Sequence, residues 1–146
     1  MQAALDQFRH LRDDYGVARS CAGLGAIAVQ SGAMADAVTP LRESLAAGLA
    51  LGDREGPAWA LELMAAALAH MQPEPAARLI GAAEALRDAL GIPLSGSEAE
   101  MHLRAISVIR AALGDDRCQA ATAAGRRLPL ADAVAFALEQ TEGIRS

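Results

Sequence analysis

Apolar residues, chiefly alanine and leucine, fill the chain in long blocks, and glycines and prolines separate one block from the next. The alternating runs of β-branched and aromatic residues that mark strands do not occur, whereas Ala, Leu, Glu and Arg, which favour helices, dominate. The pattern therefore predicts an all-α fold. The expected helices cover about residues 2–12, 17–31, 35–51, 57–71, 74–90, 98–113, 116–126 and 130–139.

Turn and cap residues set several of the expected helix ends. The segment 13–16, "DDYG", is interpreted as a turn after the first helix. Ser97, with Glu100 three residues later, forms a capping box, which predicts that the sixth helix begins directly after this serine. Asp115 or Asp116 is expected to cap the seventh helix.

A pair of helices is repeated along the chain with a shift of 39 residues. The shift aligns Leu24 with Leu63, Ala28 with Ala67, Ala37 with Ala76, Leu41 with Ile80, and Leu51-Gly52 with Leu90-Gly91. A helix pair cannot bury its apolar face alone, so successive pairs are expected to stack. We therefore expect a short α-solenoid over 1–91, with a partial repeat at 1–15, units at about 16–52 and 55–91, and a C-terminal three-helix cap at 97–140.

The repeated positions resemble the tetratricopeptide repeat. The first unit supplies Cys21, Leu24, Gly25, Ala28, Gly32, Ala37, Leu41 and Ser44 at the positions that define this repeat. The second unit supplies Ala60, Leu63, Met64, Ala67, Met71, Ala76, Ile80 and Ala83. Two methionines thus stand in the second unit where the repeat has glycine, so the resemblance is closer in the first unit.

Longer segments are similar to one region of LuxR-family and AfsR-like transcriptional regulators of the actinobacterial type. These segments are "LGDREGPAWALELMAAALA", "PEPAARLIGAAEALRDALGIPLSGSEAEMH" and "ALGDDRCQAATAAGRRLPLADAVAFALE". Such regulators join a signal-transduction ATPase of the STAND type to a C-terminal tetratricopeptide-like segment. The resemblance implies that the chain is a fragment of a larger cytoplasmic regulator and serves as its non-catalytic regulatory arm.

The composition excludes several kinds of chemistry. All 13 basic residues are arginine, so the lysine of a phosphate-binding P-loop or a Schiff base is absent. A net charge of −5 argues against binding of nucleic acid, and the adjacent Arg126 and Arg127 are expected to cap helix carbonyls. No apolar run is long enough for a membrane span. The expected partner is a protein, other domains of the parent regulator or a second copy of the chain.

In tetratricopeptide stacks, the first helices of the units line a concave groove that holds partner segments. The resemblance carries this groove over to Arg19, Ala22, Ala26, Val29, Gln30, Ala58, Leu61, Ala65, Leu68 and Ala69. The groove would be apolar, with an arginine at its edge, and would either bind a partner or pack against the cap helices or another copy. A protein-interaction module is therefore the favoured function, with a self-association module or a small-molecule sensor as alternatives.

No catalytic residue, metal ligand set or cofactor site is expected. Cys21 occupies a core position and is interpreted as a buried thiol, and together with Cys118 it fits a reducing cytosol. Glu98 and His102 have the spacing of two metal ligands on a helix, but no third ligand with suitable spacing accompanies them. Trp59 is expected to pack between units or to anchor an interface.

Overall fold

The computed structural model describes residues 2–10 and 13–144, and all regular structure in these residues is helical. This confirms the predicted all-α fold. The helices are α1 (Gln2–His10), α2 (Asp14–Gln30), α3 (Met34–Ala50), α4 (Glu55–Leu68), α5 (Pro73–Leu90), α6 (Gly96–Leu113), α7 (Asp115–Arg126) and α8 (Leu130–Gln140). No helix in these ranges is long and apolar enough to cross a membrane.

Three predictions of helix ends were wrong, and the end predicted at residue 12 lies outside the described residues. The segment 13–16 is not a turn, because the Asp13 carboxylate accepts the Gly16 N–H at 2.9 Å and caps α2. Ser97 is not a cap, because Gly96, with a φ of 59°, already turns the chain into α6. Asp115 and the residue after it lie in the first turn of α7, and Gly114 is the N-cap.

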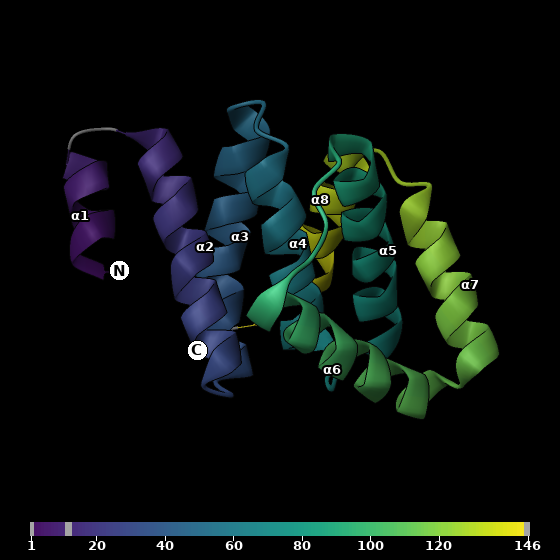
Figure 1. Cartoon of the computed structure of the whole chain (residues 1–146). Helices are drawn as coiled ribbons and strands as arrows, with labels where there is room; N and C mark the ends of the chain where they lie inside the picture. The colour runs from purple at the N-terminus through teal and green to yellow at the C-terminus, as the bar shows by residue number, and fades with distance from the viewer. Residues whose placement is uncertain (1, 11–12, 145–146) are drawn as a thin grey trace.

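Helices α2 to α5 form two adjacent pairs, α2 with α3 and α4 with α5 (Figure 1). The pairs are joined through contacts of α4 with both α2 and α3. The side chains at the centre of these contacts are almost fully buried, and the largest are Leu41, Leu45, Leu61, Leu63, Met64, Leu68, Leu79 and Ile80. Helix α1 lies outside the first pair and packs on α2 through a smaller cluster that includes Leu5, Val17 and Cys21.

The last three helices surround the second pair. Helix α6 crosses in front of α4 and α5, α7 lies beside α5, and α8 lies behind, against α3, α4 and α5 (Figure 1). Arg42 of α3 holds α8 in place, since its guanidinium donates to Thr141 Oγ1 at 2.6 Å and to the Leu138 carbonyl. Helices α6 and α8 thus cover parts of both α4 and α5, and α7 covers a further side of α5.

Helices α5 and α7 approach so closely that their backbones touch. A Cβ added at Gly125 of α7 would lie 1.8 Å from the carbonyl oxygen of Arg78 on α5. A Cβ added at Gly81 of α5 would lie 2.0 Å from the carbonyl oxygen of Thr122 on α7. Each helix thus contributes a glycine at the place where the two helices cross.

Candidate functional site

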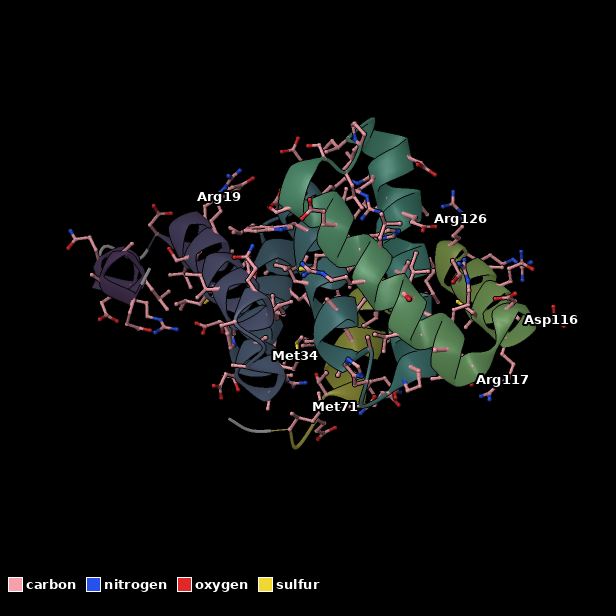
Figure 2. The ribbon with its side chains drawn as sticks, turned by 60° about the horizontal axis from the view of Figure 1, so that its bottom comes forward. Arg19, Met34, Met71, Asp116, Arg117 and Arg126 are labelled. Carbon is pink, nitrogen blue, oxygen red and sulfur yellow. The ribbon has the colours of Figure 1, made fainter. Side chains whose placement is uncertain are left out.

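The α4 half of the predicted groove lies in the interior. Its residues Ala58, Leu61, Ala65, Leu68 and Ala69 are all at most 3% exposed. Helix α6 lies across α4 in Figures 1 and 2, and its buried Met101, Ala105 and Ile109 join the same apolar core. Within this arrangement, the chain itself occupies the groove over α4.

The α2 half of the predicted groove is only partly covered. Ala22 and Val29 are buried, Ala26 is half-buried, and Arg19 and Gln30 are exposed. Figure 2 shows Arg19 projecting outward from α2. The structure therefore places the predicted groove residues on neighbouring helices, but it leaves mainly those of α2 accessible.

Two openings remain between α2, α4 and α6. One, of about 410 Å³, lies at the C-terminal ends of α2 and α4 and is lined in part by Val29, Gln30, Ala69 and Met101. The other, of about 270 Å³, includes Arg19, Ala22 and Ala58 and is closed on one side by the α5–α6 connection. We call the second opening the Trp59 cavity, because the partly buried Trp59 forms part of its wall.

A buried carboxylate stands in the wall of the Trp59 cavity. Glu62 of α4 is 2% exposed, although its neighbours in the helix are alanine, leucine and methionine. Its Oε2 accepts a hydrogen bond of 2.9 Å from Arg87 Nη1 of α5, and its Oε1 is paired with His102 Nδ1 of α6. Both oxygens of this carboxylate are therefore engaged, as the burial of a charge requires.

The contacts of Glu62 continue into a chain of polar side chains that reaches α7. His102 Nε2 lies 3.7 Å from Glu84 Oε1 of α5. Arg126 of α7 contacts Glu84 at 3.3 Å and Asp88 at 2.7 Å. These contacts link α4, α5, α6 and α7. The buried contacts of Glu62 with Arg87 and His102 help to set where α6 crosses α4, because a buried carboxylate needs well-placed partners.

The structure bears on two sequence predictions, the capping role of Arg126 and the spacing of Glu98 and His102. Arg126 does not cap carbonyls, since its guanidinium pairs with carboxylates of α5. His102 is turned toward Glu62, while Glu98 lines the mouth of the Trp59 cavity. Across the described residues, no group of three or more His, Cys, Asp or Glu side chains could hold a metal ion.

Sequence reasoning overlooked Glu62, although the sequence carries a sign of it. Between Pro57 and Ala69, Glu62 is the one charged residue in an otherwise apolar segment. A charge in such a segment is costly unless it is paired, so its presence indicates a specific partner. The partners themselves, Arg87 and His102, come from helices whose crossing the sequence does not specify.

Cys21 is a core thiol, as the sequence predicted. It is fully buried between α1 and α2, and this burial, with the neighbouring Glu43 carboxylate, raises its pKa from 9.0 to about 12. The thiolate is the reactive form of cysteine, so such a thiol is a poor nucleophile near neutral pH. The arrangement gives Cys21 a structural role.

The raised pKa of Cys21 predicts slow alkylation of the folded protein. At about pH 8, a pKa shift from 9.0 to about 12 lowers the thiolate fraction roughly a thousandfold. In the Cys118→Ala variant, iodoacetamide should therefore label Cys21 at least that much more slowly in buffer than in denaturant. The pKa of Cys21 is higher in the folded than in the unfolded chain, so the protonated thiol contributes to the free energy of unfolding. This contribution is complete below pH 9 and declines as the pH rises toward 12. Equal labelling rates in both conditions would contradict the buried position.

Comparison of the chain with protein-family models, with curated proteins and with solved structures finds no match. The function of the site is therefore inferred from its own residues and geometry.

Proposed function

We propose that the chain is a non-catalytic protein-interaction and regulatory module of a multidomain transcriptional regulator of the LuxR or AfsR-like type, acting in the cytoplasm. The segments quoted above from "LGDREG" to "AFALE" support this proposal through their resemblance to such regulators. The observation that carries it is the accessible face of α2, where Arg19 and Gln30 are exposed and Ala26 is half-buried, beside the α4 face that α6 covers.

The environments of equivalent residues support a tetratricopeptide-like stack as the architecture of the module. Ala37 and Ala76, which the 39-residue shift aligns, are both 0% exposed. Gly52 and Gly91, also aligned, follow α3 and α5 with φ values of 72° and 69°. Only glycine adopts this left-handed conformation without strain, so the two helix pairs end in the same way.

The face of α2 is the proposed contact for a partner. Arg19, Ala26 and Gln30 are accessible there, one to two turns apart along the helix, beside the covered face of α4. A partner helix that packs on Ala26 would lie near α6, with Arg19 available to a carboxylate at its edge. Small residues such as Ala26 allow two helices to approach closely.

The environments of two side chains of types that can act in catalysis, Cys21 and His102, support the non-catalytic part of the proposal. Cys21 is buried with a raised pKa, and Nδ1 of His102 is paired with Glu62. Neither group is presented to a substrate in the way that nucleophilic catalysis requires.

Photo-crosslinking tests the proposed contact. A benzoylphenylalanine at position 19, introduced into the regulator in its own cells, should give a discrete crosslinked protein on illumination. Gln30→Arg, which places a cation on the same exposed face, should reduce this product, and the same photoreactive residue at exposed position 142 should not give it. Identical products from positions 19 and 142, or a product unaffected by Gln30→Arg, would contradict a partner site on α2.

A further inference from the structure

The Trp59 cavity combines an apolar wall with several charged groups. Trp59, Pro57 and Leu94 contribute apolar surface from α4 and from the α5–α6 connection. The charged side chains that line it are the carboxylates of Asp53, Glu55, Glu62 and Glu98 and the guanidinium groups of Arg19 and Arg87. Pockets of this composition, largely apolar with a few convergent polar groups, are typical of small-molecule sites.

One ion pair and one backbone hydrogen bond engage two of the carboxylates that line the cavity. Arg87 donates to Glu62 at 2.9 Å, so this cation and this carboxylate neutralise each other. The Asp53 carboxylate accepts the Gly56 N–H at 3.2 Å and so gives a hydrogen-bond partner to a backbone N–H in the first turn of α4. The polar groups at the inner wall are thus already engaged with the protein.

The carboxylates at the mouth of the cavity are not neutralised in this way. Glu55 and Glu98 are exposed, and neither has an ion-pair partner among the described residues. Arg19, the remaining cation of the lining, lies 5.5 Å from the centroid of the Tyr15 ring at the outer side of α2. The mouth therefore carries an excess of negative charge next to an indole ring.

We propose that the Trp59 cavity binds a small organic cation, namely an ammonium or guanidinium group carried on an apolar body. The apolar body would lie against Trp59 and Leu94, and the cation would lie at the mouth near Glu55 and Glu98. Attraction to carboxylates and to the face of an indole ring favours the same sign of charge. The volume of about 270 Å³, equal to that of about nine water molecules, suits a ligand no larger than a simple aryl amine. This inference does not depend on the proposed protein partner.

A fluorescence titration of the whole chain tests the proposal, because Trp59 is its single tryptophan. Phenethylamine is the cationic probe, phenethyl alcohol its neutral counterpart, and hydrocinnamate an anion with the same ring. Phenethylamine should change the Trp59 emission saturably, with a dissociation constant on the order of 0.1–1 mM, as expected for so small a ligand. The alcohol should bind at least about fivefold more weakly, since two exposed carboxylates act on the cation, and the anion more weakly still.

Matched substitutions on the rim identify the site. Replacing both Glu55 and Glu98 with glutamine should weaken phenethylamine binding about tenfold and leave binding of the alcohol unchanged. Glu100→Gln, an exposed carboxylate of the same helix outside the cavity, should leave both affinities unchanged. The proposal is overturned if no saturable change occurs, if the three probes bind equally, if hydrocinnamate binds best, or if Glu100→Gln weakens binding as much as the double substitution. Circular dichroism of each variant verifies that the helices are intact.

Discussion

Replacing Glu62 with alanine is expected to lower the free energy of unfolding by about 3–5 kcal/mol, because it leaves Arg87 without its carboxylate in the interior. His102 loses the partner of its Nδ1 in the same step. For a chain of this length, such a loss corresponds to a decrease in Tm of roughly 10–15 °C. Chemical denaturation with the helical circular dichroism signal measures it directly.

The control for this substitution is a carboxylate of the same type at the surface. Glu74 contacts Arg117 at 3.0 Å and Arg78 at 3.5 Å, but all three side chains are more than 40% exposed. Exposed ion pairs contribute about 0–1 kcal/mol, so Glu74→Ala should change stability little. A second variant, Glu62→Leu combined with Arg87→Leu, removes both charges and should recover a large part of the loss. Similar small losses for Glu62→Ala and Glu74→Ala would contradict the buried network.

Replacing Gly125 with alanine is expected to destabilise the chain by about 2–3 kcal/mol, although alanine is the better helix former. In a helix free of contacts, this change stabilises by about 1 kcal/mol. Here the added methyl would lie 1.8 Å from the Arg78 carbonyl oxygen, so α7 must move away from α5. Backbone atoms cannot rotate aside as a side chain does, and the separation would expose apolar surface along both helices.

Gly125→Ala should therefore lower stability, the opposite of what helix propensity alone would give. Gly81→Ala should act in the same direction, since its methyl would meet the Thr122 carbonyl oxygen at 2.0 Å. Ala120→Gly, at an exposed position of α7, measures propensity alone and should cost about 1 kcal/mol. Hydrogen exchange should show α7 amides losing protection in the two alanine variants. An unchanged or increased stability of Gly125→Ala would mean that α5 and α7 do not meet at these glycines.

The helices themselves could be predicted from the sequence, because their cause is local. Blocks of alanine and leucine favour helix, and residues such as Gly52 and Gly91 end it with a conformation that other residues avoid. Cys21 could be assigned to the core because it falls at a core position of the repeat pattern. Where the prediction failed, near Asp13 and Ser97, the helices begin two to three residues before the expected positions, because more than one residue in each segment can cap a helix.

The candidate site could not be predicted in this way, because it depends on where helices cross. Glu62 and His102 are 40 residues apart, and their contact exists only because α6 returns over α4. Likewise, Gly81 and Gly125 have no local feature that assigns them to each other. A resemblance to repeat proteins predicted a groove, but the burial of its α4 residues follows from tertiary packing of the last three helices.

Helices α6, α7 and α8 cover the apolar faces of the second helix pair, and we propose that the α2 face is left for a foreign partner. The most direct test is size-exclusion chromatography with light scattering over about a hundredfold range of protein concentration. We expect a constant mass near 15.1 kDa, the mass of one chain. A mass that rises toward twice this value with concentration would contradict this arrangement, because the exposed faces would then be occupied by a second copy.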